Sequence, residues 1–308
     1  MIPHPEQQYL DAMRRAWQEG DERVDRTGVG TRSLFGVTMR FDLSDGTIPL
    51  ITTKRVYWKS AVKELIWFLS GETNIRPLVA QGVHIWTDWP LDAYARATGE
   101  AIDRDTFERR IIDDADFAAK WGDLGPVYGK QWVDWPRFTP AGDGLFCKED
   151  QGFNQIADLV HAIRTNPTSR RLIFTGWNVA DLAGMALPPC HMTYQFYVAE
   201  GRLSCALYQR SCDLGLGFPF NAFEAALLTR MLAQQCDLAA GELVWFGADV
   251  HLYLNHAELV ETQLARRPAG APRLRLLRRP DDIFGYTIDD FAVEGYTPQP
   301  HIAAPVAV

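Results

Sequence analysis

Two strand-like runs joined by a tight turn constrain the fold of this chain more than any other feature. Residues 193–198 and 202–209 have the composition of β-strands, and the dipeptide Glu200-Gly201 between them is typical of a β-hairpin turn. Cys190 stands just before the first run, and Arg210 directly follows the second. A thiol at the start of one strand and an anion-binding arginine at the end of the next suggest a sulfur nucleophile that acts on a phosphorylated substrate.

Cys190 differs in its setting from the other four cysteines. It follows two prolines, which stop the preceding structure and offer no amide hydrogens, and it precedes His191. The others are interpreted as small buried hydrophobes with raised pKa values: Cys147, Cys205, Cys212 and Cys236. The count of five is odd and no CxxC pair occurs, so the sequence favours neither a disulfide framework nor a zinc site. We therefore expect no bound metal and a reducing compartment, the cytoplasm.

Length and composition are those of a globular protein. With 308 residues, of which 47% are hydrophobic, the chain can bury a substantial core as one domain. No apolar run approaches the roughly 20 residues of a membrane span, and residues 1–6 lack the basic and apolar regions of a signal peptide. The net charge of −8 argues against a general affinity for nucleic acid. An anionic small molecule can still bind where arginines converge, and the candidates are Arg26, Arg170, Arg171 and Arg210.

Helical and strand patterns mix along the chain without a repeated βαβ unit. An amphipathic helix is expected to end at Gly20, and further helices at residues 61–69, 156–163 and 223–231. Further strands are expected at residues 171–177, 243–246 and 274–277. Glu64 lies within the apolar helix at 61–69, where a carboxylate pairs with a charge, costs stability or titrates near the working pH. The pattern predicts an α+β fold with a mostly antiparallel or mixed sheet.

Two segments interrupt this pattern and are expected to be insertions at the surface. Residues 90–120 are rich in charge, with a helix-like stretch at 105–110. Residues 139–152 carry a proline and several glycines with little periodicity. Both segments are predicted to be surface loops.

A series of short motifs runs along nearly the whole chain. They are DRTG at 25–28, TTKR at 52–55, ELIWFL at 64–69, GDLGPVYGKQW at 122–132, SRR at 169–171, PCH at 189–191, QRSCD at 209–213, PFN at 219–221, HLY at 251–253 and APVAV at 304–308. With these motifs in this order, the chain resembles the folate-dependent thymidylate synthase family. The number and order of the matches argue against coincidence.

The resemblance implies a fold, an assembly and a pair of substrates. It implies an α+β domain around a large mixed sheet covered by helices, and a homodimer that forms through the sheet faces. One cleft would hold deoxyuridylate (dUMP) and methylenetetrahydrofolate. Each site in this family borrows two arginines from the partner subunit, and the matching positions are Arg170 and Arg171.

The same resemblance implies catalytic roles. The thiolate of Cys190 would add to carbon 6 of uracil, which lets carbon 5 attack the methylene carried by tetrahydrofolate. Arg210 would favour that thiolate. Glu64 would act through water on a ring carbonyl, and Tyr128 would assist removal of the proton from carbon 5. A hydride from the folate would then complete the reductive methylation to dTMP.

Binding roles carry over in the same way. Asn221 would read the base, because its amide can accept from the ring N–H and donate to the neighbouring carbonyl. The phosphate would be held by Arg26, Arg170, Arg171, Arg210 and Ser211, and the sugar hydroxyl by His251 and Tyr253. Folate would be held by Lys54, Trp86, Trp89, Asp213 and Val308, with Asp213 also bordering the nucleotide. Purely structural roles are the alternatives: Trp86 and Trp89 as core aromatics, His251 as a structural histidine and Asn221 as a helix N-cap.

The chain departs from the family's pattern in three places. Thr87 stands where an aspartate is usual, and Phe218 stands where leucine is commoner. The residues Ala-Phe-Glu-Ala at 222–225 replace the usual Ile-Ala-Ser-Tyr, which places Glu224 close in sequence to Asn221. A more polar folate pocket would let water, rather than hydride, capture the methylene intermediate. The rival interpretation is therefore a pyrimidine-nucleotide hydroxymethylase, acting on dUMP rather than dCMP because position 221 is an asparagine. A non-catalytic nucleotide- or RNA-binding protein is a third interpretation, which the presence of Cys190 disfavours.

Overall fold

The chain forms two compact units, each assembled from separate segments. The structure is a computed structural model that describes residues 4–24 and 27–306. Unit 1 comprises Met1–Val62, Ala162–Ile173 and Cys190–Val308, and unit 2 comprises Lys63–His161 and Phe174–Pro189. None of the helices in the described part of the chain is long and apolar enough to cross a membrane.

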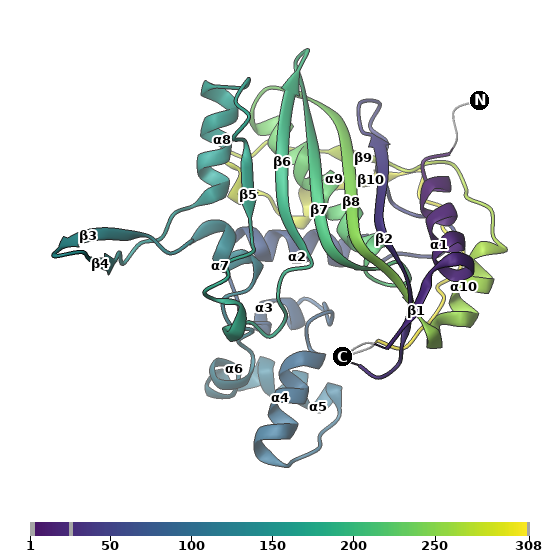
Figure 1. The fold of residues 1–308 in the computed structure, drawn as a ribbon, viewed down its shortest axis with the longest axis horizontal. Coiled ribbons are helices and arrows are strands. Elements are labelled where there is room, and N and C mark those ends of the chain that lie inside the picture. Colours follow the sequence, from purple (N-terminus) through teal and green to yellow (C-terminus); the bar gives the residue numbers. More distant parts are fainter. Residues whose placement is uncertain (1–3, 25–26, 307–308) are drawn as a thin grey trace. The chain divides into compact units, whose positions relative to one another are not determined.

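Unit 1 is built on a six-stranded mixed sheet (Figure 1). In spatial order its strands are β1 (Asp21–Arg23), β2 (Thr31–Asp42), β8 (Ala239–Tyr253), β7 (Arg202–Asp213), β6 (His191–Ala199) and β5 (Ile173–Thr175). Strands β7 and β8 are parallel, whereas the pairs β1–β2, β2–β8 and β6–β7 are antiparallel. The predicted α+β fold with a mixed sheet is confirmed.

The β6–β7 hairpin brings the ends of three strands together. Its turn residues Glu200 and Gly201 have φ values of 52° and 70°, as a tight two-residue hairpin turn requires, so the predicted hairpin is confirmed. The register pairs His191 at the start of β6 with Gln209 near the end of β7. Because β7 and β8 are parallel, the end of β8 lies there too, with His251 opposite Asp213.

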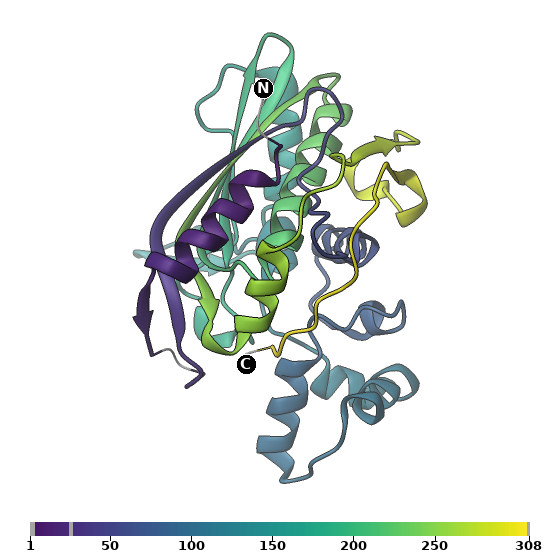
Figure 2. The same cartoon turned by 90° about the vertical axis from the view of Figure 1, so that its right-hand side faces the viewer.

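Helices cover one face of this sheet (Figure 2). Helix α9 (Phe218–Gln235) packs on β7 and β8, and α1 (Gln7–Glu19) packs on β2 and on α10 (Ala257–Leu264). Alternate residues of β7 are buried, as a strand with one covered face requires. A separate two-stranded sheet of β9 (Arg273–Leu276) and β10 (Phe291–Glu294) completes the regular structure of unit 1.

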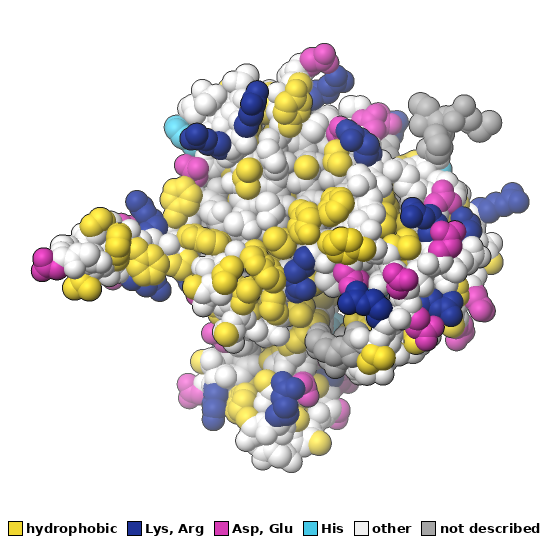
Figure 3. Space-filling view, in the orientation of Figure 1, with side chains coloured by type: hydrophobic (Ala, Val, Ile, Leu, Met, Phe, Trp, Pro, Cys, Tyr) yellow, Lys and Arg dark blue, Asp and Glu magenta, His cyan; other side chains and the backbone are white. Residues whose placement is uncertain are grey.

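The opposite face of the sheet is apolar and uncovered by any helix that the structure describes in unit 1. Phe35 is 89% exposed, Tyr197 68% and Tyr208 40%. Tyr208 on β7 stacks on Phe246 of β8, with ring centroids 5.2 Å apart. Figure 3 looks onto this face and shows hydrophobic side chains gathered there.

Unit 2 is mainly helical. Helix α2 (Trp58–Leu69) leads into it and α8 (Gln155–Thr165) leads out of it. Its other helices are α3 (Arg76–Val79), α4 (Asp88–Thr98), α5 (Arg104–Asp113), α6 (Ala115–Trp121) and α7 (Tyr128–Val133). One aromatic cluster contains Phe68, Trp86, Tyr128 and Trp132. Another contains Tyr94, Phe107, Phe117 and Trp121.

The prediction of a surface loop at residues 90–120 is wrong. This segment forms most of α4 and α6 and all of α5, in which Phe107 and Ile111 are fully buried. Only the expected helix-like stretch at 105–110, which lies within α5, is confirmed. The carboxylates of Asp103 and Asp114 cap α5 and α6, so the acidic composition that suggested a loop partly reflects helix starts.

Residues 139–152 are at the surface, as predicted, but they are not irregular. Strands β3 (Phe138–Gly142) and β4 (Leu145–Lys148) form a hairpin in which every residue is exposed, and it extends away from the helices of unit 2 (Figure 1). Its turn contains Gly142, Asp143 and Gly144, all with positive φ.

Candidate active site

Cys190 and Arg210 meet at the end of the unit 1 sheet. The backbone N–H of Arg210 donates to the carbonyl oxygen of Cys190 at 2.9 Å, and Arg210 Nη2 lies 3.9 Å from Cys190 Sγ. The thiol is partly exposed. A guanidinium at this distance favours the thiolate over the thiol, so Cys190 has the environment of a nucleophile.

The other cysteines have different environments. Burial raises the pKa of Cys205 to about 12, raises that of Cys212 well above its usual value, and also raises that of Cys236. The interpretation of these three as inert buried thiols is confirmed. It is wrong for Cys147, which is exposed on β4.

His251 lies at the same end of the unit 1 sheet, where its surroundings stabilise the protonated imidazole. Its Nδ1 atom is 3.1 Å from Asp249 Oδ1, and its ring contacts that of Tyr253 at a centroid distance of 5.3 Å. Burial lowers the pKa of His251, but the bond to Asp249 and the charge of Asp213 outweigh it, and the net shift is upward. His251 and Tyr253 are two residues apart on β8, so both can face one ligand.

The amide of Asn221 is oriented by Gln209 and Trp245, neither of which has a role in the sequence-based expectations. The indole Nε1 of Trp245 donates to Gln209 Oε1 at 2.9 Å, and Gln209 Nε2 donates to Asn221 Oδ1 at 2.8 Å. Because an indole nitrogen can only donate, it fixes which end of the Gln209 amide faces Asn221. Asn221 lies inside the first turn of α9, whose N-cap is Gly217, so the N-cap alternative is wrong.

Lys54 lies in a buried polar cluster beside Asp213. Its Nζ donates to the carbonyl oxygen of Gly215, and Gly215 N donates to Asp213 Oδ1 at 2.7 Å. Burial lowers the pKa of Lys54 to about 8, although Asp213 opposes this shift. His256 Nδ1 lies 3.8 Å from Asp213 Oδ1, and its Nε2 is 2.9 Å from the carbonyl oxygen of Pro305, so this cluster reaches the C-terminal segment.

Four candidate residues gather in unit 2. Trp86 Nε1 donates to Glu64 Oε1 at 2.6 Å, and the Trp86 ring contacts Trp89 and Tyr128 with centroid distances of 5.4 and 5.9 Å. Glu64 is 5% exposed and Trp86 is equally buried. The hydrogen bond to Glu64 gives Trp86 a polar contact that a purely hydrophobic core residue lacks.

Arg170 and Arg171 are exposed and precede β5. The carbonyl oxygen of Arg170 accepts a hydrogen bond from Gln195 Nε2 at 3.4 Å, which sets it beside the middle of β6. Cys190 precedes the first residue of that strand, and four strand residues span roughly 13 Å. The backbone of Arg170 is therefore displaced along the sheet from the thiol of its own chain. Two further candidates, Arg26 and Val308, lie outside the described residues.

Two of the departures from the family pattern lie on α9. Phe218 is a core residue, with ring centroids 5.1 Å from Tyr9 and 5.0 Å from Trp245. Glu224 is 2% exposed and follows Asn221 by one helical turn. Among the described residues no cluster of three or more His, Cys, Asp or Glu side chains could hold a metal ion.

Comparison with known proteins gives a consistent result over the full length. The family model described as thymidylate synthase matches residues 7–308. A thymidylate synthase of Rhizorhabdus wittichii is 76% identical over 308 residues, covering all of both chains. One of Sphingopyxis alaskensis is 72% identical over 306 residues, covering 99% of this chain and 98% of its own. One of Novosphingobium aromaticivorans is 67% identical over 305 residues, covering 99% and 97%. The chain belongs to the thymidylate synthase family.

Proposed function

We propose that this chain catalyses the reductive methylation of dUMP to dTMP, with methylenetetrahydrofolate as the donor of both the one-carbon unit and the hydride. Full-length relatives that carry the name thymidylate synthase support this reaction. The observation that carries it is the thiol of Cys190 beside the guanidinium of Arg210, at a sheet end that also holds His251.

Cys190 is the proposed nucleophile. Its thiolate adds to carbon 6 of the uracil ring and makes carbon 5 electron-rich enough to attack the folate methylene. Arg210 stabilises the thiolate and, with Ser211, offers donors to the nucleotide phosphate. Burial raises the pKa of Cys212 well above its usual value, which leaves Cys190 as the reactive thiol of this strand end.

Glu64 and Tyr128 are the proposed proton-handling groups. Glu64 is a buried carboxylate that accepts a hydrogen bond from Trp86, so its position is fixed independently of the substrate. Tyr128 assists removal of the carbon 5 proton. Elimination of the folate then leaves an exocyclic methylene, which a hydride from the folate reduces to the methyl group. The bond between carbon 6 and Cys190 breaks as the hydride is added, which releases dTMP, dihydrofolate and the Cys190 thiolate.

Asn221 is proposed to select uracil over cytosine. Since its Oδ1 accepts from Gln209, the amide nitrogen is directed away from Gln209. One lone pair of Oδ1 and the Nδ2 donor are then arranged to accept from the ring N–H and to donate to the carbonyl of uracil. Cytosine reverses both groups and would meet donor with donor and acceptor with acceptor.

The remaining ligand contacts are proposed from the family resemblance. His251 and Tyr253 hold the sugar hydroxyl, and Arg26 joins Arg210 and Ser211 at the phosphate. Lys54, Trp86, Trp89, Asp213 and Val308 hold folate. None of the five cysteines, all of which the structure describes, forms a disulfide bond, which agrees with the reducing compartment that we propose, the cytoplasm.

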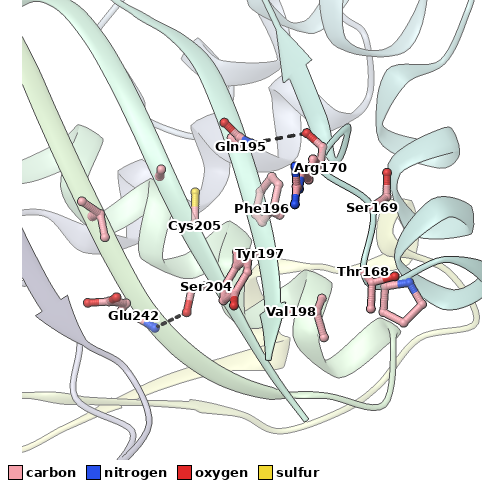
Figure 4. Close-up of a pocket in the computed structure, with 13 residues that line it drawn as sticks. Thr168, Ser169, Arg170, Gln195, Phe196, Tyr197, Val198, Ser204, Cys205 and Glu242 are labelled. Carbon is pink, nitrogen blue, oxygen red and sulfur yellow. Dashed lines mark hydrogen bonds between the residues drawn. The ribbon is translucent and has the colours of Figure 1, made fainter. Parts of the chain in front are cut away.

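We further propose that the enzyme is a homodimer paired through the uncovered sheet face. An apolar face carrying Phe35, Tyr197 and Tyr208 has the character of a buried interface. A hollow of about 210 Å³ on this face is lined by Arg170, Tyr197 and Ser204, among others (Figure 4). Arg170 and Arg171 would reach the phosphate site of the partner, because Arg170 lies away from its own Cys190 along β6.

Product analysis tests the proposed reaction. The purified protein is incubated with dUMP and methylenetetrahydrofolate, and the products are separated. Equal amounts of dTMP and dihydrofolate support the proposal. Hydroxymethyl-dUMP with tetrahydrofolate would instead identify a hydroxymethylase, and binding without any product would identify a non-catalytic protein.

A further inference from the structure

Helix α5 supplies a buried carboxylate to the turn that carries Trp86. Glu108 is 6% exposed, and its Oε1 accepts from Thr87 Oγ1 at 2.6 Å. Its Oε2 lies 2.8 Å from Nδ1 of His84. One carboxylate thus holds residues on both sides of Trp86.

Trp86 connects this turn to Glu64. Its indole Nε1 donates to Glu64 Oε1 at 2.6 Å. An indole has a single donor in a fixed direction, so a change in the position of the turn moves the donor relative to the carboxylate. Trp86 and Glu64 are each 5% exposed or less, which leaves little room for compensation.

The buried carboxylate of Glu108 indicates a role beyond filling space in the core. Burying a carboxylate is unfavourable unless it is hydrogen-bonded, and an apolar side chain would fill the same space at lower cost. Thr87 is itself fully buried, and its hydroxyl donates to a carboxylate that comes from a different helix, α5. Helix α5 itself is anchored by packing on α3, α4 and α6, so it can hold the turn in place.

We propose that Glu108 is a positioning residue for the reaction, which holds the Thr87 turn so that the indole N–H of Trp86 stays on the Glu64 carboxylate. The inference rests on the proposed function in one respect, namely that Glu64 takes part in proton transfer. Glu108 itself touches Thr87 and His84 and acts through Trp86.

The structural half of the proposal can be measured without any substrate. In protein labelled with ¹⁵N-tryptophan, the Trp86 indole resonance is identified by its loss in Trp86→Phe. We expect Glu108→Ala to shift this resonance and to speed its hydrogen exchange by about tenfold or more, as expected for a loosened site. Glu108→Gln, whose amide keeps an acceptor for Thr87, should stay within about twofold of the wild type. Asp105→Asn removes an exposed charge from the same helix and should change nothing.

The Trp245 indole, which donates to Gln209 in unit 1, is the internal reference. An unchanged Trp86 resonance and exchange rate in Glu108→Ala would overturn the proposal. An equal disturbance of Trp245 would also overturn it, because the effect would then be general loosening. If Glu108→Ala does not fold, Thr87→Val removes only the hydroxyl donor and must give the same Trp86 response for the proposal to stand.

Kinetics test the catalytic half. We expect Glu108→Ala to lower kcat about tenfold with KM for dUMP unchanged, and Glu108→Gln to restore kcat. A normal kcat together with a disturbed Trp86 resonance would overturn the catalytic role. If the wild type forms no dTMP, the proposed function fails, whereas the Trp86 measurement still decides whether Glu108 positions the indole.

Discussion

Arg210 contacts Cys190 in two ways. Its backbone N–H donates to the carbonyl oxygen of Cys190 at 2.9 Å, and its Nη2 lies 3.9 Å from the Sγ atom. The backbone bond fixes the cysteine at the junction of β6 and β7, and the guanidinium then acts on the thiol. The pairing of two strands therefore places the charge that favours the thiolate.

Replacing Cys190 by serine should abolish turnover while nucleotide binding survives. The hydroxyl is far less ionised than a thiol at neutral pH, so we expect kcat to fall on the order of 10³-fold or more. Steady-state rates and equilibrium binding of dUMP measure the two effects. Cys147→Ser, on the exposed hairpin, is the matched control and should keep full activity. Near-native turnover in Cys190→Ser would show that Cys190 is not the nucleophile.

Asn221→Asp should weaken discrimination against dCMP. Gln209 Nε2 would still donate to one carboxylate oxygen, so the other oxygen would face the base. That oxygen takes the place of the amide nitrogen and accepts from the amino group of cytosine, while the oxygen bonded to Gln209, when protonated, donates to the ring nitrogen. We expect the ratio of kcat/KM for dCMP to that for dUMP to rise about tenfold or more. Competition between the two nucleotides measures this ratio. An unchanged preference for dUMP would mean that Asn221 does not read the base.

His251 should make the stability of the fold depend on pH. The bond to Asp249 and the charge of Asp213 outweigh the effect of burial and raise the pKa of His251 above its ordinary value of 6.5. Protonation therefore stabilises the folded state, and this contribution is complete below the unfolded pKa and is lost as pH rises through the folded pKa. The difference in Tm between the wild type and His251→Gln should be larger at about pH 6 than at about pH 9. A difference that is constant with pH would contradict the assignment.

Mixing two variants, each deficient for a different reason, should restore activity if the arginines cross a dimer interface. Cys190→Ala lacks the nucleophile, and Arg170→Ala/Arg171→Ala lacks the proposed phosphate donors. One site of the mixed dimer would combine an intact thiol with intact arginines from the partner. The arginine variant alone should show mainly weaker nucleotide binding, by about 1.5 to 3 kcal/mol per charged hydrogen bond. If subunits exchange and no activity returns, the arginines serve their own chain.

Local signals made much of the fold predictable. The β6–β7 hairpin follows from the turn chemistry of Glu200-Gly201, and α8 ends at Thr165, just before Asn166-Pro167. Strand β2 was missed, because Gly36, with a φ of 83°, and several charged residues interrupt its apolar pattern. Its partner β8 lies far along the chain, and only the folded sheet pairs Thr31 with Tyr253. The sequence predicts only residues 243–246 of β8, which spans Ala239–Tyr253, because glycines and charged residues interrupt its apolar pattern as well.

The site residues that belong to a recognisable sequence motif were predictable. Cys190 and Arg210 follow from sequence, and the structure brings them together. The orientation of Asn221 by Gln209 and Trp245 depends on side chains that share a site only after folding. The same holds for the carboxylate that α5 supplies to Thr87, since the charge-rich composition around it indicated a loop.

The source of the atoms added to carbon 5 tests the central claim most directly. A single turnover of dUMP and methylenetetrahydrofolate is run in H₂¹⁸O, and the nucleotide product is analysed by mass spectrometry. Reductive methylation predicts dTMP that carries no ¹⁸O, formed together with one equivalent of dihydrofolate. A hydroxymethyl nucleotide containing ¹⁸O, formed with tetrahydrofolate, would contradict the proposed reaction.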